Sequence, residues 1–179
     1  MNGGPAQPRV VLVGAPGAGK TSVGRLVAER LGTGFRDTDD DVVALAGKPV
    51  SDIFVDDGEA AFRELERGAV ARAVDEWPGV LALGGGAVLD PRTRQLLRSV
   101  AASGCPVVHL AVSAGEAYKR VGMARDRPLL LGAPRAQLTA LLRARAPLYA
   151  EVATVALDTD GKEPGEVAEE VLAVVAGRA

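Results

Sequence analysis

The sequence predicts an α/β fold in which a five-stranded parallel sheet lies between two layers of helices. Two features of the chain support this prediction. Short apolar segments alternate with longer segments of helical apolar spacing along the whole sequence, as in sheets built from strand–helix–strand units. The first apolar segment also leads into a glycine-rich loop and then a helix. Because right-handed connections keep such strands parallel, we expect ligand-binding residues at the carboxyl edge of the sheet.

The first strand–loop–helix unit carries the most informative motif of the chain. Val10–Val13 is a short apolar run rich in β-branched residues and predicts a buried strand. Residues 14–21 then fit the pattern GxxxxGK(S/T), and a helical apolar spacing continues to Leu31 before Gly32 ends it. Strand, loop and helix occur in the order that a phosphate-binding loop requires.

The chemistry of such a loop follows from its geometry. Glycines allow consecutive backbone N–H groups to point at one anion, and the helix start adds its positive dipole end. Lys20 would bring a full charge to the β- and γ-phosphates, and the Thr21 hydroxyl would ligate Mg²⁺. A glycine-rich turn that binds nothing is the alternative, but the strand and helix on either side disfavour it. The predicted nucleotide-binding residues here are Gly14, Ala15, Pro16, Gly17, Ala18, Gly19, Lys20, Thr21 and Ser22.

Composition narrows the class of protein. The chain has 179 residues, 47% hydrophobic and 25% charged, which suits one globular domain at 9–179 after a disordered tail at 1–8. A net charge of −2 argues against nucleic acid as a partner. Cys105 is the only cysteine, so an intrachain disulfide or multi-cysteine zinc site is excluded. With no signal segment or apolar run of membrane length, we expect a cytoplasmic enzyme without membrane partners, and we expect a monomer.

The other elements follow from apolar spacing and from helix start and stop residues. Gly47 and Trp77-Pro78-Gly79 end two of the helices, Asp90-Pro91 opens another, and Ser51 is the expected cap of a short turn. Further strands are predicted at 35–37, 80–83, 107–112 and 152–157. Helices are predicted at 39–46, at 59–76, from 91 onward, at about 114–122 after a capping box at 113–116, and at 135–144 and 166–175.

Acidic and glycine residues follow two of the predicted strands. Strand 80–83 ends without a carboxylate, although many phosphate-loop enzymes hold Mg²⁺ there, so Asp37 after strand 35–37 is the candidate. Its alternative role is to cap the next helix. Asp39 lies two residues on, and we expect both acids to face the site. Gly84 to Gly86 form either a plain turn or a backbone that a ligand approaches closely, and three glycines favour the second interpretation.

Several basic residues are ambiguous on their own. Arg63 on a helix and Arg145 near another are each compatible with a solvated charge. Residues 125–134 form a loop rich in proline and arginine that could close as a lid and bring Arg127 to the transferring phosphate. His109 lies within an apolar strand, where a structural role is expected rather than a catalytic one.

Taken together, these residues resemble the shikimate kinase family from about Arg9 to the last predicted helix. The phosphate loop alone is shared by a very large superfamily, whereas the later motifs in this order and spacing are far more specific. The matching motifs are GAPGAGKTSVGR at 14–25, DTD at 37–39, DIF at 52–54, DGE at 57–59, FR at 62–63, LGGGAV at 83–88, RPLL at 127–130 and RAPLY at 145–149.

The resemblance implies a phosphate-loop fold like that of nucleoside monophosphate kinases, with a substrate-binding region at about 39–76 and a lid at about 123–134. It implies transfer of the γ-phosphate of ATP to the 3-hydroxyl of shikimate, in aromatic amino-acid biosynthesis. Catalysis would rest on Lys20, Asp39 and Arg127, and Mg²⁺ on Thr21 and Asp37. Shikimate would contact Asp39, Arg63, Gly84, Gly85, Gly86 and Arg145, and the nucleotide would also contact Arg120, Arg127 and Pro164.

Two other hypotheses explain part of the sequence. Another small-molecule kinase, for gluconate or a nucleotide, would use the loop and lid but would leave the two arginines and the glycine triplet unexplained. A nucleotide-binding regulatory module without turnover is the second. Its guanine-reading form needs an Asn-Lys-x-Asp motif, and the only asparagine of the chain is Asn2. An ATP sensor would not need the catalytic positions, all of which are filled here.

Overall fold

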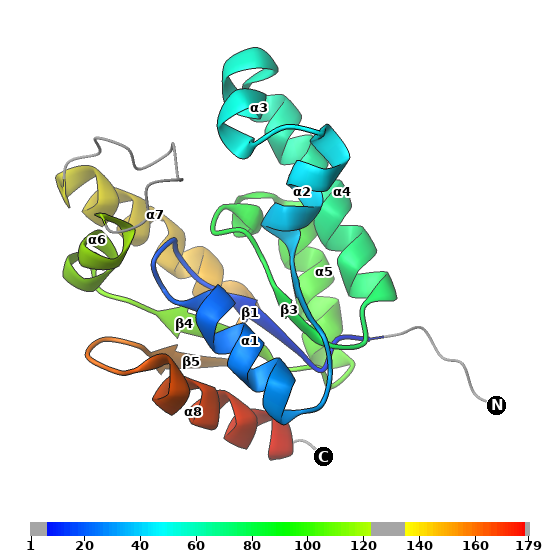
Figure 1. Cartoon of the computed structure of the whole chain (residues 1–179), viewed down its shortest axis with the longest axis vertical. Coiled ribbons are helices and arrows are strands. Elements are labelled where there is room, and N and C mark those ends of the chain that lie inside the picture. The colour runs from blue at the N-terminus through cyan, green and yellow to red at the C-terminus, as the bar shows by residue number, and fades with distance from the viewer. Residues whose placement is uncertain (1–6, 123–134, 178–179) are drawn as a thin grey trace.

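The computed structural model describes residues 7–122 and 135–177 (Figure 1). Its strands are β1 (Val10–Val13), β2 (Phe35–Asp37), β3 (Val80–Ala82), β4 (Val107–Ala111) and β5 (Val155–Asp158). Its helices are α1 (Lys20–Arg30), α2 (Thr38–Ala46), α3 (Val50–Asp56), α4 (Gly58–Glu76), α5 (Pro91–Ala102), α6 (Ala114–Gly122), α7 (Arg135–Val152) and α8 (Pro164–Ala176), with a 3-10 turn η1 (Ala87–Leu89). The predicted alternation of strands and helices is therefore confirmed.

In the described residues the strands form one parallel sheet in the order β2-β3-β1-β4-β5. The first strand is central: Leu12 is level with Ala82 of β3 on one side and Val108 of β4 on the other. Because all strands run the same way, their carboxyl ends lie at one edge. The loop after β1, the acids after β2 and the glycine triplet after β3 therefore meet there, as the sequence predicts.

The sheet is covered on both faces, which makes a three-layer sandwich (Figure 1). Alternate residues of β1 point to opposite faces, so this central strand contributes to two cores. Val11 and Val13 pack with apolar residues of α4, α5 and α7. Val10 and Leu12 pack with those of α1 and α8. A strand that is covered on both faces has no side exposed to water. This explains why the central strands are continuous apolar runs in the sequence.

A third, smaller cluster lies away from the sheet. Val42 of α2, Ile53 of α3 and Phe62 and Ala69 of α4 form its buried centre. Figure 1 shows α2, α3 and the start of α4 projecting beyond the sheet as a separate lobe, within the predicted substrate-binding region 39–76. Helix α2 follows β2 directly, so this lobe begins at the carboxyl edge of the sheet.

Several predicted element limits are wrong. Helix α7 does not end at Ala144 but continues through Pro147 to Val152, where a fifth strand was expected to begin. Arg145, Tyr149 and Val152 recur at helical spacing and are buried while Pro147 is exposed. Burial of that face outweighs the cost of about 3 kcal/mol for a proline inside a helix.

Helix starts differ by one or two residues. Helix α3 begins at Val50 after Pro49, so Ser51 is not its cap and donates instead to the Asp52 carboxylate at 3.2 Å. Helix α8 begins at Pro164, two residues before the predicted start, because the Glu166 side chain accepts from the Glu163 N–H at 2.7 Å. The Glu163 side chain accepts in turn from the backbone N–H of Glu166, which completes a capping box. These two hydrogen bonds fix a helix start more firmly than apolar spacing does.

Some predictions fall outside the description or concern membranes. Of the expected tail, residues 1–6 are not described, and Pro8 is buried. The lid predicted at 123–134 also lies outside the described residues. Among the helices of residues 7–122 and 135–177, none is long and apolar enough to cross a membrane.

Candidate active site

The phosphate loop joins β1 to α1 in the predicted manner. Gly19 is the residue before α1 and has a φ of 91°, a conformation that glycine adopts without strain. Lys20 follows and is buried, and its Nζ donates to the carbonyl oxygens of Gly14 at 2.7 Å and Ala15 at 3.1 Å. The ammonium group therefore lies over the loop itself, at the positive end of α1.

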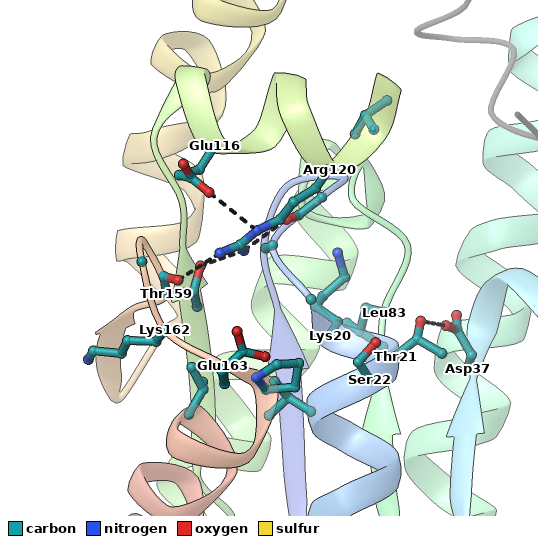
Figure 2. A pocket seen from close by; sticks show the side chains of 18 of the residues that line it. Lys20, Thr21, Ser22, Asp37, Leu83, Glu116, Arg120, Thr159, Lys162 and Glu163 are labelled. Atoms are coloured by element: carbon teal, nitrogen blue, oxygen red, sulfur yellow. Dashed lines mark hydrogen bonds and ion pairs between the residues drawn. The ribbon is translucent and has the colours of Figure 1, made fainter. Parts of the chain in front are cut away.

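A cavity of about 530 Å³ borders this loop (Figure 2). It extends from the loop and the start of α1 to the acids after β2 on one side. On the other it reaches α6 and the segment that joins β5 to α8. Its volume lies in the range of small-molecule sites, and the helix N-terminus within it favours an anionic ligand.

Asp37 holds two partners at once. Its Oδ1 accepts from the Asp39 N–H at 3.0 Å, which caps α2, and its Oδ2 accepts from the Thr21 hydroxyl at 3.1 Å (Figure 2). The interpretation of Asp37 as the cap of α2 is therefore confirmed. It leaves the second carboxylate oxygen available for the predicted role beside Mg²⁺. A hydroxyl and a carboxylate are ligands that suit Mg²⁺, which completes its shell with water and phosphate oxygens. Within the described residues no cluster of three or more His, Cys, Asp or Glu could hold a metal.

The far end of the cavity is built by Arg120 of α6. Its guanidinium donates to the Gly17 carbonyl at 3.2 Å and to the hydroxyl and carbonyl of Thr159 at 3.1 and 2.7 Å (Figure 2). Pro164 borders the same end beside Lys162, whose ammonium pairs with Glu170 at 2.7 Å. Thr159 was not predicted as a site residue, because a lone threonine after a strand carries no motif. Arg127 lies outside the described residues.

On the other side of Asp39, three charged groups from two helices come together. Arg63 of α4 donates to the carboxylate of Glu66 at 2.7 Å, and Glu66 is only 3% exposed. Arg145 of α7 is 8% exposed and acts on Glu66 electrostatically. Burial raises the pKa of Glu66, and the charges of Arg63 and Arg145 oppose that rise. Two arginines that are 82 positions apart in sequence thus both lower the pKa of one buried carboxyl, Arg63 through a direct ion pair and Arg145 through its charge.

Glu66, like Thr159, is a site residue that sequence analysis missed. A signal for it exists: it stands four residues after Phe62 and three before Ala69, both buried, on the inner face of α4. A charged residue at an inner position of an amphipathic helix is buried only when it is paired. The pairing partner Arg63 lies one turn away, at the spacing i, i+3.

The glycine triplet after β3 is packed tightly on all sides. A Cβ on Gly84 would lie 2.5 Å from the Asp39 carboxylate, and one on Gly85 would lie 2.8 Å from Pro16. A Cβ on Gly86 would overlap the Arg63 guanidinium. Within the described residues, the close approach predicted for these glycines is therefore made by side chains of the chain itself. Glycine allows the acid, the arginine and the phosphate loop to converge on one segment.

Neither His109 nor Cys105 lines the phosphate-loop cavity. His109 of β4 is half-buried, and its ring stacks on that of Tyr149 with centroids 4.7 Å apart. Burial lowers the pKa of His109, and the charge of Lys20 lowers it further, so the imidazole is neutral at physiological pH. Cys105 is buried before β4.

Comparison with known proteins agrees with this geometry. A family model described as shikimate kinase matches residues 16–176. A shikimate kinase of Frankia casuarinae is 61% identical over 89% of this chain and 69% of its own, and one of Saccharopolyspora erythraea is 56% identical over 92% of each. The solved shikimate kinase of Acinetobacter baumannii in complex with shikimate is 33% identical and superposes with a TM-score of 0.88 over 96% of this chain and 93% of its own. The chain belongs to the shikimate kinase family.

Proposed function

We propose that the site transfers the γ-phosphate of ATP to the 3-hydroxyl of shikimate, with the residue roles given below. The observation that carries this proposal is that Arg63, Arg145 and Asp39 all act on Glu66, while Asp39 also lines the phosphate-loop cavity. Two arginines suit a carboxylate, and a neighbouring carboxylate suits hydroxyl groups. Shikimate carries both kinds of group on one ring.

On the nucleotide side, the loop N–H groups and Lys20 would hold the β- and γ-phosphates. Lys20 now donates to loop carbonyls, and we expect it to exchange these for phosphate oxygens, since a charged donor binds an anion more strongly. Thr21 and Asp37 would hold Mg²⁺, which neutralises charge on the phosphate oxygens when bound. Arg120 and Pro164 would border the adenine.

On the substrate side, Arg63 and Arg145 would bind the carboxylate and so fix the orientation of the ring. Glu66 keeps the Arg63 guanidinium in place before substrate binds. The three glycines would form the wall against which the ring packs. Phosphoryl transfer depends mainly on such positioning and on charge stabilisation.

Asp39 would accept hydrogen bonds from the substrate hydroxyls. Because its backbone N–H is held by Asp37, the start of α2 fixes its position relative to the metal ligands. In a loose transition state the attacking hydroxyl keeps its proton until late, so we assign Asp39 to positioning first and to proton acceptance second. Arg127, outside the described residues, would reach the phosphate from the lid.

We further propose that the protein acts as a monomer. We also propose that it acts without nucleic acid, in keeping with its net charge of −2. Light scattering after gel filtration tests the first statement. A mass of twice 18.4 kDa would refute it.

The experiment that tests the reaction is coupled ADP release with ATP and Mg²⁺ against shikimate, quinate, gluconate and AMP. Turnover with shikimate at least about a hundredfold above the others is the expected result. Each of the others carries an anionic group, but none places it relative to its hydroxyl groups as the flat ring of shikimate does: quinate is saturated and has an extra hydroxyl beside the carboxylate, gluconate is open-chain, and AMP carries a phosphate and a purine. Preference for gluconate or AMP would indicate another small-molecule kinase. Nucleotide binding without turnover on any member would indicate a regulatory module.

A further inference from the structure

Tyr149 is a buried residue next to Arg145 to which the proposed function gives no role. It lies on α7, one turn after Arg145, and is 2% exposed. Its hydroxyl donates to the carbonyl oxygen of Gly85 at 2.6 Å. The hydrogen bond joins α7 to the middle of the glycine triplet across 64 positions of sequence.

The triplet is held at other points as well. The Thr38 hydroxyl accepts from the Gly84 N–H at 3.1 Å, which ties one end to the start of α2. Pro16 of the phosphate loop packs against the α-carbon of Gly85. The Tyr149 hydrogen bond is therefore a third point of attachment, beside the start of α2 and the phosphate loop. It fixes the direction in which the Gly85 carbonyl points. A glycine segment has no side chains of its own to fix that direction.

The tyrosine ring is supported in turn by His109. The two rings are nearly parallel, at 22°, with centroids 4.7 Å apart. His109 belongs to β4, the strand that pairs with β1. The Tyr149 ring is therefore supported by a residue of the central sheet. Both rings border a second cavity of about 340 Å³ whose wall also includes Ala15 of the phosphate loop. With space on one side of the ring, the stack, the Gly85 hydrogen bond and a contact of the hydroxyl with Arg145 hold it in place together with its apolar neighbours.

We propose that Tyr149 is a positioning residue for shikimate: through the Gly85 carbonyl it fixes the glycine wall at the correct distance from Arg63 and Arg145. This inference rests on the proposed function of the site. Helix α7 would thereby supply both a cation for the carboxylate and the support of the opposite wall. A shift of that wall would change the fit of the substrate ring directly, whereas it would reach the phosphate loop through the contact of Gly85 with Pro16.

The protonation state of Tyr149 agrees with a donor role. Burial raises the pKa of the phenol to about 12, against the opposing charge of Arg145. The hydroxyl therefore remains a donor at every pH at which the enzyme would be assayed. We expect no pH dependence of shikimate binding from Tyr149 itself.

The test is Tyr149→Phe, which removes one oxygen and leaves the ring stack. We expect the KM for shikimate to rise about fivefold to twentyfold, the range for leaving one buried carbonyl without its donor. The KM for ATP should change less than about twofold, a split that a general loss of packing would not produce. Tyr118→Phe is the matched control, because Tyr118 is the only other tyrosine and is 49% exposed on α6.

A second pair of variants keeps the proposal testable if Tyr149→Phe does not fold. His109→Ala removes the stack and should raise the shikimate KM about twofold to fivefold, the range for an aromatic pair. His109→Phe restores a flat ring and should recover most of that loss. An unchanged shikimate KM in Tyr149→Phe, or in His109→Ala where the first variant is unfolded, would overturn the proposal. A parallel rise of both KM values would overturn it too.

Failure of this inference is distinguishable from failure of the proposed function. The unmodified protein is assayed with shikimate and ATP in the same experiment. If it does not phosphorylate shikimate, the proposed function fails and the inference fails with it. If it does and the Tyr149 variant shows no shikimate effect, only the inference fails.

Discussion

The nucleotide side and the substrate side of the site are built in different ways. The first, as proposed, is largely one stretch of consecutive residues, of which 17–23 line the cavity. The second, as proposed, consists of Asp39, Arg63, Glu66 and Arg145, which come from three helices and interact around the buried carboxylate of Glu66. A local motif therefore specifies the nucleotide side, whereas the substrate side depends on how distant helices pack. Substitutions should separate the two sides in kinetics and in stability.

The largest expected effect is on the nucleotide side. Lys20→Met should lower kcat by about a thousandfold or more, because it removes a charged group aimed at the transferring phosphate. The loop backbone is retained, so the melting temperature should stay within a few degrees of that of the unmodified protein. Coupled ADP release and circular dichroism measure the two quantities. Lys119→Met, on the exposed surface of α6, is the control, and equal activity of the two variants would contradict the account.

Arg63→Ala should produce the next largest effect, on the substrate side alone. Loss of one partner from a buried charge cluster costs about 2–5 kcal/mol, which corresponds to a rise of at least about thirtyfold in the KM for shikimate. The KM for ATP should be nearly unchanged. Arg67→Ala is the matched control, one turn along α4, where the arginine pairs with Glu64 and Asp90 instead. A shikimate KM that does not change would remove Arg63 from the carboxylate site.

Asp37→Asn should have an intermediate effect. Asparagine caps a helix as well as aspartate, so the start of α2 is kept. The loss of charge beside Thr21 should raise the Mg²⁺ concentration needed for half-maximal rate by about tenfold to a hundredfold. Titration of Mg²⁺ at fixed ATP measures it. If Mg²⁺ dependence is unaltered, Asp37 serves only as a cap.

The smallest expected effect concerns stability and Glu66. Because burial raises the pKa of this carboxyl in the folded protein above its ordinary value of 4.5, the folded state binds the proton more tightly than the unfolded state. Its contribution to stability is therefore full below pH 4.5 and falls as pH rises through the folded pKa. As pH rises through that range, the unmodified protein loses this contribution and Glu66→Gln does not. The melting temperature of the variant minus that of the unmodified protein should therefore increase by a few degrees. A difference that stays constant with pH would show that Glu66 does not titrate in this way.

The sequence predicts the fold and the nucleotide side because their causes are local. A buried strand, a glycine loop and a helix start each depend on residues within a few positions of one another. Asp37 could be assigned two roles from its place after a strand: its role as the cap of α2 is confirmed, and its role as a metal ligand stays a prediction. The arginines of the substrate side could be named only through the family motifs.

What could not be predicted depends on long-range packing. The spacing of α4 places Glu66 on its inner face, but only the packing of α7 against the site brings the charge of Arg145 to it. Tyr149 was not a candidate because α7 was expected to end at Ala144, before Pro147. Local propensity gave the wrong helix end there, since the burial of residues beyond the proline decides it.

The central claim is that Arg63 and Arg145 bind the carboxylate of the substrate. The most direct measurement is a cycle of kcat/KM values for the unmodified protein and Arg63→Ala, each with shikimate and with its uncharged carboxamide. If the arginine acts on the carboxylate, the variant should lose little with the carboxamide, and the two changes together should cost far less than the sum of each alone. Equal losses on both substrates would mean that Arg63 supports the fold of the site and that the carboxylate is bound elsewhere.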